Sequence, residues 1–214
     1  MCTLTINLNA LKKQTMKKLI LLSILFSNLA FSQKAMYEIC PIKNGQEVPR
    51  AQVINKDGKE VELKNYIGDR TVVVVFYRGA WCPYCTRQLS ALSQIKSMLD
   101  SLNVELIAIS ADDYTKIDSS YIRSGAEEYV LFSDKNVSAI NAFGIGWKVD
   151  DQLYQKYKTQ YGMDAEWWSG SKHHVLPVPA IFVVEKSVIK HQYVNPNYSK
   201  RLSPKVLLSF VEGE

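Results

Sequence analysis

Two cysteines three positions apart carry the clearest chemical signal in the sequence. Cys82 and Cys85 form the motif Trp81-Cys82-Pro83-Tyr84-Cys85, which follows an apolar run and opens a segment with helical periodicity. The first turn of a helix lowers the pKa of a thiol, because backbone N–H groups and the helix dipole favour the thiolate. The second thiol then lies on the same side of the helix and can attack a disulfide or a sulfenic acid formed on Cys82. The sequence therefore predicts a redox-active dithiol with Cys82 as the nucleophile.

Three neighbours are expected to support the pair. Pro83 occupies the first helical position, where its fixed φ suits the first turn. Trp81 shields the thiols from water on one flank. Arg78, four residues before Cys82, either stabilises the thiolate by its charge or is a surface charge, and the sequence leaves both interpretations open.

A proline far downstream is a further supporting candidate. Pro179 directly precedes the apolar segment 180–184. A proline that opens a strand is a place where a cis peptide bond occurs. Pro177, two residues earlier, competes for the same role.

A C-x-x-C pair can also be two structural cysteines that only pack in the interior, or half of a metal site. Zinc requires two further Cys or His ligands at short spacing, and the sequence has no second C-x-x-C. The available histidines are His173, His174 and His191, all far downstream. The adjacent His173 and His174 are either a metal site or ordinary loop residues. We expect no metal and no organic cofactor, and a metal-binding or delivery protein remains as the alternative of another class.

The composition is that of an ordinary globular protein with a charged N-terminus. Apolar residues make up 47% of the 214 residues and charged residues 22%, which allows one well-buried domain and argues against extended disorder. Residues 1–32 contain four lysines and no acid, and subtracting these four from the net charge of +5 leaves +1. A nearly neutral domain lacks the basic surface that nucleic-acid binding requires, so we expect no nucleic-acid partner.

The N-terminus has the pattern of an export signal. Lys17-Lys18 precedes the mostly apolar stretch 19–31, and small residues precede a cut before Gln33. Because the stretch is short for a membrane span and contains polar residues, we expect a cleaved signal peptide over 1–32 and no stable membrane span afterwards. Met16 is the more natural start. The protein is expected to be exported, to the periplasm or the medium.

The mature chain is expected to begin with a mobile leader, residues 33–44. Its Cys40 is a single thiol that either forms an intermolecular bond or has no function. The domain proper then covers 45–214, with an insert at 150–175. Aromatic side chains of the insert either line a substrate groove or pack inside: Tyr154, Tyr157, Tyr161, Trp167 and Trp168.

Hydrophobic periodicity predicts alternating strands and helices. We expect a hairpin over 51–63 and further strands at 71–77, 104–110, 129–132, 180–184 and 188–193. Helices are expected from Pro83 to Leu102, over 113–124, 137–143 and 150–163, and from Pro204 to Val211. Residues 166–174 are expected to form a loop. Alternation of this kind predicts an α/β domain with a central mixed sheet and helices on both faces.

The sequence also resembles a known family. The segment 75–89, which contains the dithiol, resembles the redoxin core of the peroxiredoxin-like branch of the alkyl hydroperoxide reductase/thiol-specific antioxidant family. Residues 45–63 resemble its opening hairpin, 176–184 its cis-proline strand and 193–202 its closing segment. The resemblance implies a thioredoxin-like fold with an N-terminal β-hairpin, and Pro179 in cis beside the dithiol.

Two positions depart from the pattern of typical peroxiredoxins. Val75 and Gly79 stand where those enzymes carry a Pro and a Thr or Ser before the peroxide-attacking Cys. The arginine that they place near the strand after the active site has no clear counterpart.

The resemblance implies an oxidoreductase, and two reactions fit it. In the first, Cys82 attacks a peroxide, Cys85 resolves the product to a disulfide, and a thioredoxin-like reductant regenerates the dithiol. In the second, the same pair exchanges with a disulfide of another protein. The reduction potential of the pair relative to its compartment decides the direction of that exchange.

Overall fold

A run of β-branched residues forms an interior strand of the main sheet. The computed structural model describes residues 38–125 and 129–213, all within the second of two units of the chain, 34–214. Strand β3 (Thr71–Phe76) pairs in parallel with β4 (Val104–Ser110) on one side and antiparallel with β8 (Ala180–Glu185) on the other. Strands buried on both faces read as continuous apolar runs, which is why these segments were predictable.

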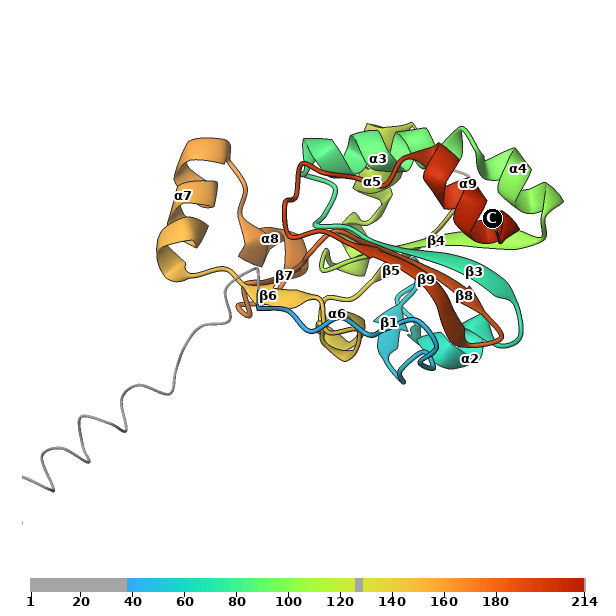
Figure 1. Ribbon diagram of the computed structural model, residues 1–214. Helices are drawn as coiled ribbons and strands as arrows, with labels where there is room; N and C mark the ends of the chain where they lie inside the picture. Colours follow the sequence, from blue (N-terminus) through green and yellow to red (C-terminus); the bar gives the residue numbers. More distant parts are fainter. Residues whose placement is uncertain (1–37, 126–128, 214) are drawn as a thin grey trace, which may run out of the picture. The chain divides into compact units, whose positions relative to one another are not determined.

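The remaining strands complete a mixed sheet of seven strands in the order β2-β1-β5-β4-β3-β8-β9 (Figure 1). The parallel part is β3, β4 and β5, and antiparallel strands flank it. The strands not yet given bounds are β1 (Gln52–Ile54), β2 (Glu60–Glu62), β5 (Val130–Ser133) and β9 (Val188–Val194), of which β2 and β9 form the edges. The predicted N-terminal hairpin is the β1–β2 pair, and the predicted closing hairpin is β8–β9.

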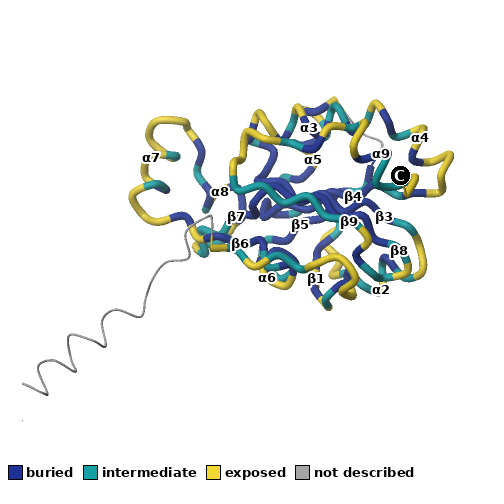
Figure 2. The backbone as a smooth tube through the Cα atoms, in the orientation of Figure 1, coloured by how far each residue is buried: buried dark blue, intermediate teal, exposed yellow. Residues whose placement is uncertain are grey.

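Side chains of β3 alternate between two cores, because successive residues of a strand point to opposite faces. Val72, Val74 and Phe76 pack with the helices α2 and α6, whereas Val73 and Val75 pack with α3, α4 and α9. The strands are accordingly the most buried part of the chain (Figure 2). These helices are α2 (Leu63–Ile67), α3 (Pro83–Ser93), α4 (Lys96–Ser101), α6 (Ser138–Ala142) and α9 (Pro204–Glu212). The prediction of an α/β domain with helices on both faces is confirmed.

Three details of the helical segments differ from expectation. The helix predicted from Pro83 to Leu102 is two helices, because Ile95 leaves helical geometry at φ −103° and ψ 7° and α4 begins after it. Residues 113–124 form a short 3₁₀ turn, η2 (Tyr114–Lys116), followed by α5 (Asp118–Ser124). The five-residue α2 was not predicted, because so short a segment has no readable period.

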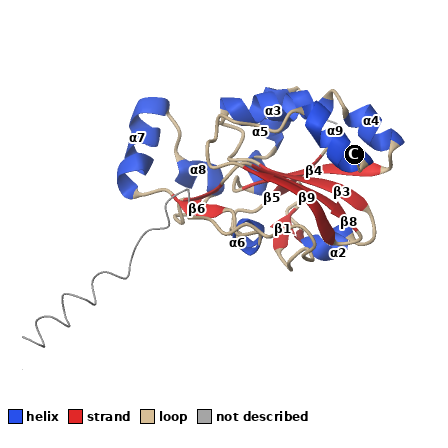
Figure 3. Cartoon of the chain, in the orientation of Figure 1, coloured by secondary structure: helices blue, strands red, loops and turns tan. Residues whose placement is uncertain are grey.

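The insert adds its own small layer outside the sheet (Figure 3). It contains α7 (Asp151–Tyr161) and α8 (Ala165–Ser169), and the strands β6 (Gly146–Lys148) and β7 (Val175–Pro177) pair at its base. The predicted loop over 166–174 is wrong in its first part. Asp164 caps α8 by accepting from the backbone N–H groups of Glu166 and Trp167, and this capping stabilises a short helix there.

The peptide bond before Pro179 is trans, as are all peptide bonds of the described residues. The expectation of a cis bond is therefore wrong. The chain runs from β7 into β8 without a reversal, and both sides of the proline are held: the Val178 N–H donates to the Ile145 carbonyl at 2.9 Å, and the Pro179 carbonyl accepts from Asn195 at 3.2 Å. Pro179 is buried, and it precedes the pair Ala180–Phe76 in the sheet.

The segment expected to be a mobile leader is described from residue 38 onward. Its backbone pairs with the end of α6, where Cys40 and Ile42 donate to the carbonyls of Gly144 and Phe143, each at 3.1 Å. The expected signal peptide, 1–32, lies outside the described residues. Within the described residues no helix is both long enough and apolar enough to cross a membrane.

The face of the sheet opposite the thiols offers a stability prediction. Phe182 is fully buried between Phe76 and Phe143, with ring centroids 6.0 Å and 5.0 Å away. Phe182→Ala is expected to lower the free energy of unfolding by about 3–5 kcal/mol, because it leaves a cavity. Urea unfolding measures this. Met98→Ala, at a residue that is 53% exposed, is the control and should change stability little. Equal losses in both variants would contradict the assigned core.

Candidate functional site: a buried dithiol at the start of α3

The two cysteines lie at the start of α3, the helix that follows β3 in the chain. Cys82 is the N-cap residue of α3 and Pro83 is its first helical residue. The backbone N–H groups of Cys85 and Thr86 both donate to the Cys82 carbonyl at 3.0 Å. Cys82 and Cys85 are free thiols and are 1% and 0% exposed. The helix start thus presents two buried sulfurs side by side.

The surroundings of Cys82 favour its thiolate. A hydrogen bond from the Cys85 side chain is the largest cause, and with the charges of Arg78 and Arg201 and the Cys85 backbone N–H it lowers the pKa of Cys82 to about 6. Burial acts in the opposite direction. The direction of the shift favours the thiolate of Cys82, which is the state that a nucleophilic sulfur needs.

Cys85 has the opposite tendency. Burial raises its pKa well above the ordinary value, and its hydrogen bond to Cys82 and the Cys82 charge raise it further. The guanidinium of Arg201 partly offsets this, since its Nη2 donates to the Cys85 sulfur at 3.5 Å. The pair is thus divided into a thiolate and a proton-carrying thiol, which suits a nucleophile and a resolving partner.

Arg78 is a buried cation, 5% exposed, and not a surface charge. Its guanidinium carbon lies 4.8 Å from the ring centroids of Trp81 and Tyr198 and 5.4 Å from that of Tyr157. Its Nη2 donates to the Tyr157 hydroxyl at 3.0 Å. Of the two interpretations of Arg78, the structure favours the one in which its charge stabilises the Cys82 thiolate.

A buried carboxyl group holds the loop before Cys82. Asp112 is 1% exposed, and it accepts from the backbone N–H of Ala80 at 2.8 Å and from the Trp81 side chain. Burial raises its pKa to about 7, and the Cys82 charge acts in the same direction. Gly79, with φ +146°, leaves room for this contact, because a Cβ there would lie 2.6 Å from Asp112 Oδ1 and closer still to the indole nitrogen.

Sequence reasoning missed Asp112 and Arg201. Asp112 follows β4, thirty positions from the dithiol, and nothing local distinguishes it from its neighbour Asp113. Arg201 lies in the closing segment 193–202 that carried part of the family resemblance, and this was the one signal that could have drawn attention to it.

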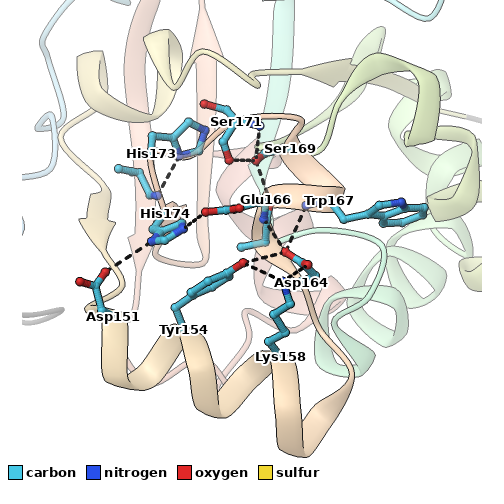
Figure 4. A network of polar contacts seen from close by, with 12 residues as sticks. Asp151, Tyr154, Lys158, Asp164, Glu166, Trp167, Ser169, Ser171, His173 and His174 are labelled. Atoms are coloured by element: carbon cyan, nitrogen blue, oxygen red, sulfur yellow. Dashed lines mark hydrogen bonds and ion pairs between the residues drawn. The ribbon is translucent and has the colours of Figure 1, made fainter.

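The insert histidines are engaged in packing and hydrogen bonds. His174 stacks on Tyr154 at 4.1 Å and bonds Glu166 at 2.9 Å, while His173 accepts from the Val175 N–H at 2.8 Å and lies 3.0 Å from the Lys135 carbonyl (Figure 4). No group of three or more His, Cys, Asp or Glu side chains in the described ranges is arranged to hold a metal ion. The contacts of both histidines are with neighbouring side chains and backbone groups that pack the insert together.

The insert aromatics divide between packing and exposure. Tyr154 and Trp168 are buried in a third core with Met163, whereas Tyr161 and Trp167 are 66% and 58% exposed. Tyr157 is half-buried against Arg78. The five aromatic side chains are thus divided between the interior and the surface of the insert.

A thioredoxin-like sheet with a low-pKa cysteine at the start of its first long helix defines a redoxin of the thioredoxin superfamily. The sequence profile of the AhpC/TSA family matches residues 44–192. The chain belongs to this family.

Two kinds of curated relative are similar to the chain. The peroxiredoxin Bcp of Escherichia coli strain K12 is 30% identical over 105 residues, 49% of this chain and 66% of that protein. The thiol-disulfide oxidoreductase ResA of Bacillus anthracis is 26% identical over 102 residues, 48% of this chain and 58% of that protein. The alignments thus span less than two thirds of either relative.

Solved structures share the fold at low sequence identity. Reduced Prx3 from Vibrio vulnificus in complex with H₂O₂ has a TM-score of 0.65 at 16% identity, over 79% of this chain and 99% of that one. AhpC from Enterococcus faecalis has a TM-score of 0.59 at 17% identity, over 79% and 90%. These likenesses establish the thioredoxin-like architecture.

Asp112 generates a pH-dependent stability prediction. Its folded-state pKa is raised, so its contribution to stability is complete near pH 4 and is lost as the pH rises towards 7. Asp112→Asn removes this loss. Between pH 4.5 and 7.5, wild-type stability should therefore fall relative to the variant by a few kcal/mol in urea unfolding.

Asp134 provides a matched control, because its pKa is also raised by burial to about 7 and the causes of its shift do not include Cys82. Relative to Asp134→Asn, as relative to Asp112→Asn, the wild type should lose stability between pH 4.5 and 7.5. Only Asp112→Asn should also lower the pKa of Cys82. Parallel pH profiles of wild type and Asp112→Asn would contradict the assignment.

Proposed function

We propose that this chain is a peroxiredoxin-like oxidoreductase that reduces peroxides through a dithiol–disulfide cycle of Cys82 and Cys85. The observation that carries the proposal is the geometry of the pair: two free, buried thiols three residues apart at the start of α3, with Cys82 at its N-cap. The pKa shifts, down for Cys82 and up for Cys85, act in the direction that this geometry suggests. A nucleophile that is ionised at neutral pH, next to a thiol that keeps its proton, supplies both steps of such a cycle without a cofactor.

In the first step the Cys82 thiolate attacks one oxygen of the peroxide. A sulfur–oxygen bond forms, the O–O bond breaks, and the leaving oxygen takes up a proton to become water or an alcohol. Cys82 is then a sulfenic acid. The guanidinium groups of Arg78 and Arg201 supply positive charge at the site where negative charge moves onto the leaving oxygen.

In the second step Cys85 attacks the Cys82 sulfur. A disulfide forms and the sulfenic oxygen leaves as water with the proton that Cys85 gives up. Cys85 lies in the first turn of α3, three residues from Cys82, so the bond closes within one helical turn. A thioredoxin-like reductant then reduces the disulfide and completes the cycle.

Thiol–disulfide exchange with other proteins is the second candidate reaction. Two observations favour it: the ResA relative, and Gly79 at the position where typical peroxiredoxins carry Thr or Ser. The near-complete burial of Cys82 favours the first candidate, because a small peroxide reaches an enclosed sulfur more easily than a protein disulfide does.

Export of the chain is part of the proposal. The lysine pair 17–18, the apolar stretch 19–31 and the small residues before Gln33 support a cleaved signal peptide, followed by a redoxin domain over 45–214 with its insert at 150–175. In a Gram-negative host the protein should accumulate in the periplasm with the mass of a chain that begins at Gln33. An uncleaved chain in the cytoplasm would contradict this part.

The reaction itself is tested by rapid mixing of the reduced protein with hydrogen peroxide, following tryptophan fluorescence. We expect a fast change in the wild type, none in Cys82→Ser, and in Cys85→Ser a sulfenic acid that dimedone traps and that does not proceed to a disulfide. Trp81 lies beside Cys82 and reports the change.

The controls separate the two candidate reactions. A wild-type rate no faster than that of a small free thiol would remove peroxide as the substrate. If the same protein then reduced an oxidised protein substrate rapidly, and Cys82→Ser did not, thiol–disulfide exchange would be the function. Slow reaction with both would contradict the proposed dithiol cycle.

A further inference from the structure

The buried cation Arg78 is held by aromatic rings. It lies in the segment 77–81 between β3 and Cys82, which we call the thiol loop. Arg78 lies between Trp81, Tyr157 and Tyr198, with ring centroids 4.8–5.4 Å from its guanidinium carbon. In the part of the chain that the structure describes, Arg78 forms no ion pair with a carboxylate and its Nε has no hydrogen-bond partner. A buried guanidinium without a carboxylate keeps its full charge available to the nearby thiolate.

One of these rings comes from the insert. Tyr157 lies on α7, and its hydroxyl accepts the hydrogen bond from Arg78 Nη2 at 3.0 Å. Both groups come from distant parts of the chain, 79 positions apart. The hydroxyl also fixes the direction of the guanidinium, because cation–π contacts alone leave the planar group free to slide across the ring.

The orientation of α7 is set one turn earlier. Tyr154 is 5% exposed and stacks on His174, and its hydroxyl donates to Asp164 at 3.0 Å. Figure 4 shows Tyr154 among these partners, with α7 running beside them. The same small core contains Ala80, which belongs to the thiol loop. The helix that carries Tyr157 is therefore anchored to the loop that carries Arg78.

We propose that Tyr157 is a positioning residue, which holds the Arg78 guanidinium against Trp81 and thereby makes the insert a working part of the thiol site. The proposal rests on the proposed function in one respect, that Cys82 is the reactive sulfur. A guanidinium that swings towards solvent is screened by water and loses most of its effect on a buried thiolate. The insert thus controls the nucleophile without contacting the substrate.

The test is the pH profile of alkylation of Cys82 by iodoacetamide in the full chain, with the modified cysteine identified by peptide mass spectrometry. In the wild type the rate should be half-maximal near pH 6. Tyr157→Phe keeps the ring and removes the hydrogen bond. It should move the profile to higher pH and lower the rate at pH 6 about twofold.

Tyr161→Phe is the matched control. Tyr161 lies one turn further along α7 and is 66% exposed, and its ring is tilted relative to that of Tyr157, with centroids 6.2 Å apart. Loss of the Tyr161 hydroxyl should leave the pH profile of Cys82 alkylation unchanged. If Tyr157→Phe acted only by loosening α7 in general, Tyr161→Phe would shift the profile as well. Circular dichroism verifies that each variant is folded.

A double variant decides whether Tyr157 acts through Arg78. Arg78→Met should shift the profile further than Tyr157→Phe, and adding Tyr157→Phe to Arg78→Met should produce no additional shift. Arg78→Lys keeps the charge without the planar group and should shift the profile less than Arg78→Met. A wild-type profile for Tyr157→Phe, or full additivity in the double variant, would overturn the proposal.

The outcome is independent of the substrate. Alkylation reports only the thiolate population and its access, so a protein that fails to reduce peroxide still shows whether Tyr157 positions Arg78. Conversely, a normal peroxide reaction with an unshifted Tyr157→Phe profile would remove this inference and leave the proposed function intact.

Discussion

A negative charge kept on a buried sulfur is the constraint on which the rest of the site depends. Cys82 is almost fully enclosed, and burial by itself would favour the neutral thiol. The charge is stabilised only because several donors and cations converge on it from separate elements: the start of α3, the loop after β3 and the closing segment. Each of these must be placed accurately, and the sheet provides the rigid reference that places them.

The two arginines of the site come from opposite ends of the domain's sequence. Arg78 follows β3 directly, whereas Arg201 arrives between β9 and α9, after the antiparallel hairpin has brought the chain back across the sheet. The insert lies between Arg78 and Arg201 in the sequence, and it contributes Tyr157, which binds the guanidinium of Arg78. The additions to the central β–α–β core therefore meet at the same end of the sheet.

The fold and the dithiol could be predicted because their signals are local. The run 71–77 and the spacing of Cys82 and Cys85 are visible within a few residues. The roles of Asp112 and Arg201 depend on which distant residues the fold brings together, and no local pattern encodes that. The peptide bond before Pro179 is trans, and the position of a proline at the start of a strand does not by itself determine its isomer. Short elements such as α2 and α8 are fixed by caps and packing and not by periodicity.

The space next to the Cα of Gly79 is occupied by the side chains of Trp81 and Asp112, so a side chain on residue 79 would exclude them. Either the indole N–H of Trp81 reaches Asp112, or residue 79 has a side chain; a Cβ at that position would overlap both partners. The residue types at 79 and 81 are thus tied to each other as a unit. A chain of this family that placed a hydroxyl at position 79 would have to turn Trp81 away and leave the buried carboxyl group with one donor fewer. The hydrogen bond between Trp81 and Asp112 is therefore kept only as long as residue 79 remains a glycine.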